Sequence, residues 1–163
     1  MTVRTADLAD EFGDEVQVLE PIFRDFGGVS SFSGAIATVD VFEDNVLVRE
    51  MLGSPGEGRV LVVDGGGSLQ VALLGEELAG LARDNGWSGI VIYGCVRDVA
   101  GLGEIAIGIR ALASTPRRSF KRGSGLCDLP LHFAGVGFRP GAYLYADEDG
   151  ILVAPRDLLA GVE

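Results

Sequence analysis

The chain has 163 residues, of which 47% are hydrophobic and 23% are charged. This length and balance predict one globular domain over residues 1–163 and exclude a disordered or collagen-like chain. Acidic residues (24) outnumber basic residues (13), and the net charge of −11 disfavours binding to DNA or to an anionic membrane surface. A small anionic ligand or a basic protein partner stays open, because local arginines and helix N-termini can outweigh the global charge.

The rare residue types narrow the chemistry. The two cysteines form no CxxC pair and no signal peptide is evident, so we expect a cytoplasmic protein. No apolar run reaches 18 residues, so no membrane span is predicted. His132 is the only histidine, which excludes multi-histidine metal sites. Any metal would be held by carboxylates and water, so Mg²⁺ or Mn²⁺ is expected.

The first part of the chain predicts short helices and strands in alternation. Thr5 is a candidate helix cap, with Leu8 and Phe12 four residues apart on one helical face. A later helix ends at the strong breaker that begins at Gly53. The predicted elements are a helix over 5–12, strands over 16–19 and 34–41, and a helix over 44–52.

The central part predicts a βαβ unit. Residues 59–64 (RVLVVD) and 89–93 (GIVIY) are apolar runs typical of buried parallel strands. The helix between them follows a glycine run, ends at Asn85-Gly86 and is predicted to bury one face, which consists of Leu74, Leu78, Leu81 and Ala82.

The rest of the chain is rich in β-structure. Residues 105–112 form another apolar stretch, and turns are predicted at Arg139-Pro140-Gly141 and at 147–150. The β-rich segments are 119–121, 129–138, 143–145 and 151–153. A βαβ centre flanked by such segments predicts a layered α/β fold with a mixed sheet rather than a purely doubly wound one.

Two strand ends carry residues that are candidates for binding or catalysis. Ligands of parallel α/β units collect at the carboxyl ends of the strands. The glycine run 65–67 fits neither a Walker loop nor GxGxxG, so nucleotide binding is disfavoured and a tight turn is the simpler interpretation. Arg97-Asp98 follows the strand 89–93 and would face the start of the preceding helix, Gly75 to Leu78, if the two strands are neighbours.

These residues together suit a 2-oxo acid. An arginine such as Arg97 clamps a carboxylate, and Asp98 could hold a divalent cation with several waters. Free N–H groups near Glu76 to Leu78 could receive a substrate carboxylate. Such a site would stabilise an enolate and promote cleavage of a carbon–carbon bond. The alternative is an ordinary surface ion pair after a strand.

Other candidate residues have weaker support for a functional role. Cys95 lacks an obvious base, Ser68 lacks a nucleophile elbow, and His132 fits a structural strand position. One basic cluster, Arg117-Arg118 with Lys121-Arg122, is either a solvated face or a patch that binds anions or an acidic partner.

The sequence resembles the RraA-like family, which includes the regulator of ribonuclease activity A and the 4-hydroxy-4-methyl-2-oxoglutarate aldolases. The resemblance covers about residues 5 to 158. The segments that carry it are VVDGGGS (62–68), GIVIYGCVRD (89–98), FAGV (133–136), PG (140–141) and YAD…GI (145–151). The segments EPIF (20–23), FGG (26–28) and FEDN (42–45) are closer to the regulator branch.

The resemblance implies an α/β/β swivelling-type domain that forms a homotrimer in the cytoplasm. It also implies a divalent-metal-dependent lyase, an aldolase or oxaloacetate decarboxylase that acts on a small 2-oxo acid. By the match, Gly75, Glu76, Glu77 and Leu78 bind the pyruvoyl carboxylate, Arg97 binds the carbonyl and carboxylate side, and Asp98 holds the metal. Arg97 and Glu76 would be the catalytic residues.

Two positions depart from the aldolase pattern. Glu76 stands where the aldolases usually have Asp, and Gly101 stands where they have an acid three residues after the Asp. Both departures disfavour full aldolase activity, whereas oxaloacetate decarboxylation asks less of the site. The alternative function is a non-catalytic regulator that binds and inhibits a ribonuclease, for which the acidic charge suits a basic partner. Methyl transfer is rejected, because no glycine-rich methyl-donor site of the usual type is found.

Overall fold

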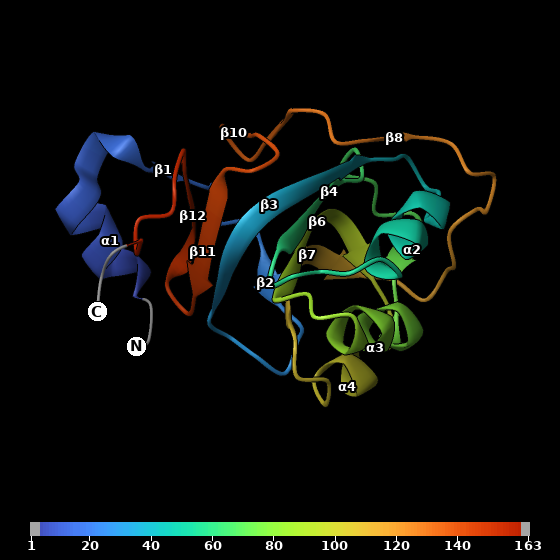
Figure 1. Cartoon of the computed structure of the whole chain (residues 1–163). Coiled ribbons are helices and arrows are strands. Elements are labelled where there is room, and N and C mark those ends of the chain that lie inside the picture. Colours follow the sequence, from blue (N-terminus) through green and yellow to red (C-terminus); the bar gives the residue numbers. More distant parts are fainter. Residues whose placement is uncertain (1–3, 161–163) are drawn as a thin grey trace.

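The structure is a computed structural model that describes residues 4–160. The helices are α1 (Thr5–Phe12), α2 (Val46–Leu52), α3 (Glu76–Asp84) and α4 (Val99–Leu102), with a 3₁₀ turn, η1, over Gly13–Glu15 (Figure 1). The strands are β1 (Gln17–Val18), β2 (Arg24–Asp25), β3 (Phe32–Asp40), β4 (Val60–Asp64), β5 (Ala72–Leu74), β6 (Gly89–Val96), β7 (Gly108–Ser114), β8 (Leu126–Cys127), β9 (Leu131–Phe133), β10 (Val136–Phe138), β11 (Tyr143–Asp147) and β12 (Gly150–Ala154).

Most strands join one mixed sheet, as the sequence predicts. Its order is β1-β12-β11-β3-β4-β6-β7-β2, with β5 paired to β6 and β8 paired to β3. The centre, β3-β4-β6-β7, is parallel, whereas β11 and β12 extend it with antiparallel pairs. The predicted strands 59–64 and 89–93 are therefore neighbours, and their carboxyl ends lie at the same edge.

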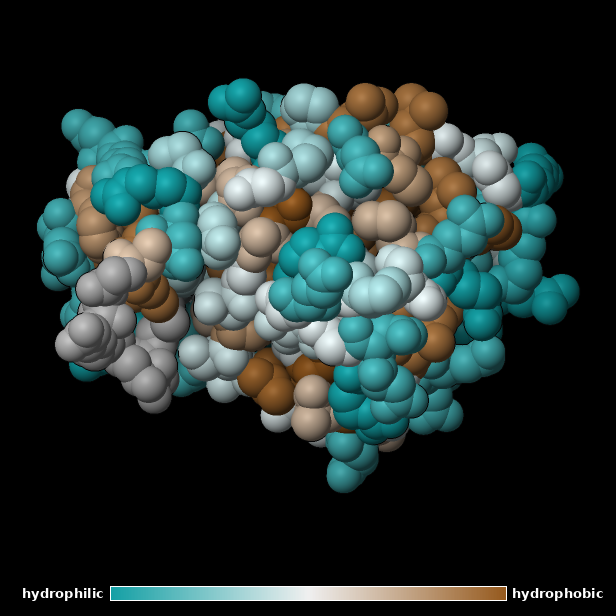
Figure 2. All heavy atoms as spheres, in the orientation of Figure 1, coloured by the Kyte–Doolittle hydropathy of each residue, from teal (hydrophilic) through white to brown (hydrophobic). Residues whose placement is uncertain are grey.

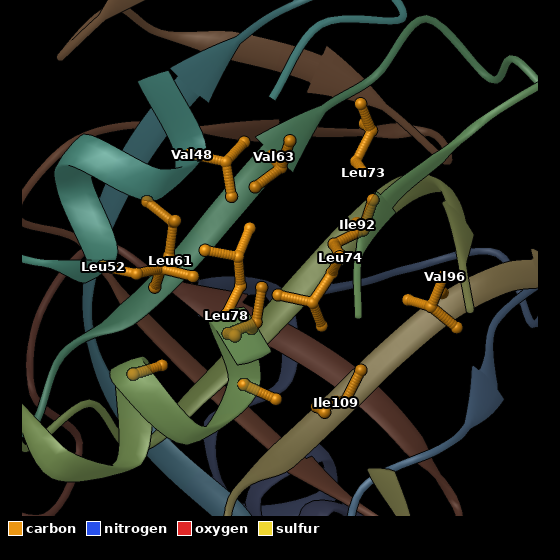
Figure 3. Close-up of a cluster of buried hydrophobic side chains, with 14 of the residues drawn as sticks. Val48, Leu52, Leu61, Val63, Leu73, Leu74, Leu78, Ile92, Val96 and Ile109 are labelled. Carbon is orange, nitrogen blue, oxygen red and sulfur yellow. The ribbon is translucent and has the colours of Figure 1, made fainter. Parts of the chain in front are cut away.

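The sheet is buried on both faces, which gives the α/β/β layering. Successive side chains of a strand point to opposite faces. Leu61 and Val63 of β4 belong to the core beneath the helices, where Figure 3 shows them beside Leu52 and Val48 of α2. Val60 and Val62 belong to the core on the other face, which includes side chains of the β9–β10 hairpin. This double burial explains the continuous apolar run in β4.

The hairpin layer is anchored by aromatic stacking. The ring of Phe133 in β9 stacks on Phe138 of β10 and on Tyr93 of β6, with centroids 4.4 and 4.9 Å away. Its two-residue turn is Ala134-Gly135, and both residues have positive φ (52° and 79°), as a tight hairpin of this handedness requires.

Three local predictions are wrong. Leu74 lies in strand β5 and not on the helix, because the chain first pairs with β6 before α3 begins at Glu76. Thr5 does not cap α1; its N–H and hydroxyl both donate to the carboxylate of Asp147 (2.7 and 2.6 Å). Residues 119–121 form no strand and make only an isolated bridge, between Phe120 and Asp44. Between residues 4 and 160, no helix has the length and apolar character needed to cross a membrane.

Candidate functional site

Strand β5 brings the two predicted site segments together. Leu74 of β5 pairs in parallel with Val96 of β6, and the pairing continues as the N–H of Arg97 donates to the carbonyl of Leu74 (2.9 Å). The chain then enters α3 at Glu76 on one side and α4 at Val99 on the other. Both strand-to-helix junctions therefore lie side by side at the carboxyl edge of the sheet, where α/β proteins bind ligands.

Asp98 links the two junctions. Its backbone is left-handed (φ 61°, ψ 42°), a conformation that Asp tolerates better than most residues. From there its carboxylate Oδ2 accepts a hydrogen bond from the N–H of Glu76 (3.0 Å), so it caps α3 and not its own helix, α4. The side chain remains exposed. Helix geometry leaves the first-turn N–H groups of α3 without intrahelical partners, and Asp98 takes one of them.

Gly75 is required for this close approach. A Cβ at position 75 would lie 2.5 Å from Asp98 Oδ2 and 3.5 Å from Cγ of Arg97.

Arg97 itself is half-buried, and its guanidinium donates a long hydrogen bond (3.4 Å) to the carbonyl of Pro116. The guanidinium is therefore tethered only weakly at the mouth of the site.

Glu76 and Gly101 are in direct contact. The Glu76 carboxylate oxygen Oε2 lies in the space that a Cβ on residue 101 would occupy. The two departures from the aldolase pattern thus meet in space: the longer acid at 76 reaches over the position where the pattern has a second acid.

A cavity of about 300 Å³ opens beside these groups. All six predicted site residues line it, namely Gly75, Glu76, Glu77, Leu78, Arg97 and Asp98. The structure adds residues that the sequence analysis did not assign to the site: Asn45, Arg49, Ala72, Leu74, Arg118, Ser119 and Lys121. For Arg118 and Lys121 the signal was the basic cluster at 117–122, but nothing in the sequence indicated that this cluster returns to the helix start.

The cavity concentrates positive charge in an acidic protein. Arg49, Arg97, Arg118 and Lys121 line it, against three acids, although the whole chain carries −11. Arg49 forms an ion pair with Glu77 (3.1 Å), and Lys121 donates to the side-chain oxygen of Asn45 (3.0 Å). Figure 2 shows mainly hydrophilic residues around α3 and α4, the two helices that begin beside the cavity. The arrangement suits a small anion.

The donor set fits a hard divalent ion that keeps its own waters. Within residues 4–160, no group of three or more His, Cys, Asp or Glu side chains is arranged to hold a metal ion. The exposed Asp98 carboxylate uses Oδ2 toward Glu76, which leaves Oδ1 for a ligand. Mg²⁺ commonly takes only one or two protein carboxylates and completes its shell with water and substrate oxygens. Asp98 would hold such an ion.

The remaining candidates do not join this site. Cys95 is buried within β6, and burial raises the pKa of its thiol, which opposes nucleophilic chemistry. His132 is exposed on β9, in the hairpin layer. The glycine run after β4 forms a tight turn in which the N–H of Gly66 donates to the carboxylate of Asp64 (2.8 Å).

Known proteins are similar to this chain in sequence and fold over almost their full length. A protein from Laribacter hongkongensis named "Putative 4-hydroxy-4-methyl-2-oxoglutarate aldolase" is 57% identical over 159 residues, which is 98% of this chain and 100% of the relative. The RNA-processing inhibitor RraA from Thermus thermophilus is 49% identical with a TM-score of 0.95, covering 100% of this chain and 98% of that one. A structure from Geobacillus kaustophilus described as an S-adenosylmethionine:2-dimethylmenaquinone methyltransferase is 54% identical with a TM-score of 0.96, covering 99% and 100%.

The family model for RraA-like proteins, described as Aldolase/RraA, matches residues 5–153. All of the segments that carry the resemblance lie within the matched residues. The chain belongs to the RraA-like (Aldolase/RraA) family.

Proposed function

We propose that the protein is a divalent-metal-dependent lyase that cleaves a carbon–carbon bond of a small 2-oxo acid. Its reactions would be those of a 4-hydroxy-4-methyl-2-oxoglutarate aldolase and an oxaloacetate decarboxylase. The observation that carries the proposal is the single cavity that joins the start of α3, Arg97 and Asp98. The name of the relative that is 57% identical supports the same reaction class.

The residues divide the work of binding. The first-turn N–H groups of Glu77 and Leu78 would receive the substrate carboxylate at the positive end of α3. Arg97 would hold the carbonyl and carboxylate side by charge-assisted hydrogen bonds, which its loose tether to Pro116 allows. Asp98 would hold Mg²⁺ or Mn²⁺, which when bound polarises the substrate carbonyl and supports the enolate charge.

The chemistry then follows the electron pair of the broken bond. In oxaloacetate, C3–C4 breaks, CO₂ leaves and the electron pair forms the enolate of pyruvate, which takes a proton at C3. Arg97 stabilises the negative charge that develops on the enolate oxygen. In the aldol reaction the distal hydroxyl must also lose a proton, and the carboxylate of Glu76 would serve to accept it. Its contact with Gly101 places that carboxylate away from the aspartate geometry of the pattern, so decarboxylation is expected to be the faster reaction.

The test is pyruvate formation from oxaloacetate with Mg²⁺ or Mn²⁺. We expect a rate above that of the free metal, abolished by EDTA and reduced at least about 100-fold in Arg97→Ala. Arg83→Ala is the matched control, since Arg83 is an exposed arginine of α3 that pairs with Asp84 outside the cavity. A wild-type rate no higher than metal alone would contradict the proposal.

A second candidate is binding to a ribonuclease. A cavity of about 600 Å³ is lined by Glu20, Asp25, Glu148 and Asp149, and the relative that is 49% identical is described as an RNA-processing inhibitor. These acids suit a basic segment of a partner. Binding to a purified ribonuclease should weaken steeply between roughly 0.05 and 0.5 M salt and in the variant Glu148→Gln/Asp149→Asn, but not in Arg97→Ala. Salt-independent binding would contradict this candidate.

The proposal includes self-association. Family membership supports a homotrimer, for which sedimentation should give the mass of three 17.1 kDa chains. A single-chain mass at micromolar concentration would contradict it.

A further inference from the structure

One acid of the chain is buried next to the cavity without lining it. Asp44 lies between β3 and α2 and is 2% exposed. A buried carboxylate needs hydrogen-bond donors around it. Its Oδ1 accepts from the N–H of Val46 (3.0 Å), and its Oδ2 accepts from the N–H groups of Arg122 (2.6 Å) and Ser124 (3.4 Å). Burial alone would raise the pKa of this carboxyl, but these backbone hydrogen bonds outweigh burial and lower it.

Two of these donors belong to the loop that carries the basic cluster. The segment 115–125 joins β7 to β8 without a helix or strand of its own. It is fastened to residues 43–45 by two more backbone hydrogen bonds, from Phe120 N–H to the Glu43 carbonyl (2.8 Å) and from Asn45 N–H to the Phe120 carbonyl (3.4 Å). The Asp44 carboxylate then accepts the hydrogen bonds of the turn that follows Lys121, from the N–H groups of Arg122 and Ser124. Without it, the part of the loop beyond Phe120 would lose the two hydrogen bonds that its backbone N–H groups donate to segment 43–45.

The fastened loop brings the ammonium of Lys121 to the cavity. The ammonium of Lys121 donates to the side-chain oxygen of Asn45 (3.0 Å), and the amide nitrogen of Asn45 donates to the carbonyl of Leu73 (3.2 Å). Lys121 and Asn45 line the cavity with Arg97 and Asp98. A lysine side chain has several rotatable bonds, so its ammonium keeps one position only when its hydrogen-bond partner and its own backbone are both held in place.

We propose that Asp44 is a positioning residue for the anion site. It touches no ligand itself; it holds the backbone of residues 122–124, and thereby fixes the Lys121 ammonium at the cavity. The proposal rests on the proposed function in that the anion is a 2-oxo acid. Its consequence is that affinity for the anion depends on a buried carboxylate outside the cavity.

The first experiment compares Asp44→Asn, Lys121→Gln and the double variant. The measurements are the dissociation constant of oxalate in the presence of Mg²⁺ and the KM and kcat for oxaloacetate. Each single change should weaken oxalate about tenfold and raise KM similarly, with kcat within about twofold of wild type. The double variant should be no weaker than either single variant, because Asp44 acts through Lys121. Asp40→Asn, at an exposed acid that ends β3, is the control and should bind as wild type.

Two results would overturn the proposal: unchanged oxalate affinity in Asp44→Asn, or losses that multiply in the double variant. A second readout needs no ligand. Hydrogen exchange should show the Arg122 and Ser124 amides protected in the wild type, and faster in Asp44→Asn but not in Lys121→Gln. If wild-type protein binds no oxalate, the proposed function fails, and the exchange of these amides still decides whether Asp44 holds the loop. Unprotected amides in the wild type would refute it, even if Asp44→Asn failed to fold.

Discussion

The carboxylate of Asp98 accepts a hydrogen bond from the backbone N–H of Glu76, 3.0 Å away, across two different strand-to-helix junctions. The left-handed backbone at Asp98 turns the side chain toward α3, and the absence of a Cβ at Gly75 leaves room for it. One carboxylate thus caps the start of α3 through Oδ2, and its Oδ1 is left for the metal ion that the proposed function assigns to Asp98.

The substitution Asp98→Asn separates these two roles. The amide oxygen can still accept from the N–H of Glu76, so the fold should be kept, but the negative charge that would hold a divalent ion is lost. We expect metal-dependent pyruvate formation to fall by more than about 100-fold, with a melting temperature close to that of wild type. Asp84→Asn, at an exposed acid that ends α3, is the matched control. Full activity in Asp98→Asn would disprove a metal role for this carboxylate.

The contact between Glu76 and Gly101 gives a prediction at a residue with no side chain. In Gly101→Ala the new methyl group would occupy the place of the Glu76 carboxylate oxygen, and the flexible side chain would swing away. We expect kcat/KM for cleavage of 4-hydroxy-4-methyl-2-oxoglutarate to fall about tenfold, because a displacement of about 1 Å at a reacting group is costly for rate. Oxaloacetate decarboxylation, which needs no proton from a distal hydroxyl, and stability should change little.

The control for this change is Gly103→Ala in the same segment. A Cβ there would meet nothing nearer than a backbone oxygen at 3.7 Å, which is ordinary contact. Equal kinetics in the two variants would show that the Glu76 carboxylate need not lie over residue 101.

Local sequence patterns predicted the central fold well. The apolar runs 59–64 and 89–93 are neighbouring parallel strands, and Arg97-Asp98 does face the start of α3, as expected from strands that end at one edge. The predicted helix over 5–12 has the bounds of α1. These elements are set by apolar runs, periodicity and breakers within a few residues, which a sequence displays directly.

What escaped prediction depends on contacts between distant segments. The spacing of Leu74 to Leu78 predicts a helix, but pairing with Val96 makes Leu74 a strand residue. Lys121 lines the cavity because its loop folds back onto residues 43–45, which lie more than 70 positions earlier in the sequence. The sequence predicts Thr5 as a helix cap, whereas its hydroxyl donates to Asp147, 142 residues away. Such partners leave no local pattern in either segment.

The Thr5–Asp147 contact predicts a pH dependence of stability. Burial alone would raise the pKa of the Asp147 carboxyl, but hydrogen bonds from the hydroxyl and N–H of Thr5 and from the N–H groups of Asp149 and Gly150 lower it below its ordinary value of 3.8. A carboxyl with a lowered pKa in the folded state stabilises the protein above its unfolded pKa, and this contribution is lost as pH falls through the folded pKa.

The variant Asp147→Asn isolates this contribution. At pH 7 we expect it to lower the free energy of unfolding by about 1–3 kcal/mol, since buried hydrogen bonds to a charged acceptor are removed. The difference from wild type, measured by urea unfolding, should shrink as pH falls below about 4. A difference that stays constant down to pH 2 would show that the charge of Asp147 plays no part.

Two paired glycines of the sheet pack against one aromatic ring. Gly89 of β6 and Gly108 of β7 are register partners, and a Cβ on either would run into the ring of Phe32, which is buried against both. Gly108→Ala should therefore destabilise the protein by about 2 kcal/mol through overpacking, and lower Tm by about 6 °C. Gly80→Ala is the contrast: in α3 its Cβ would meet only the end of Arg83 at 3.8 Å, so helix propensity should raise stability by about 1 kcal/mol. If Gly108→Ala were as stable as wild type, the Phe32 ring would have room to move, and close packing at this pair would not be what selects glycine.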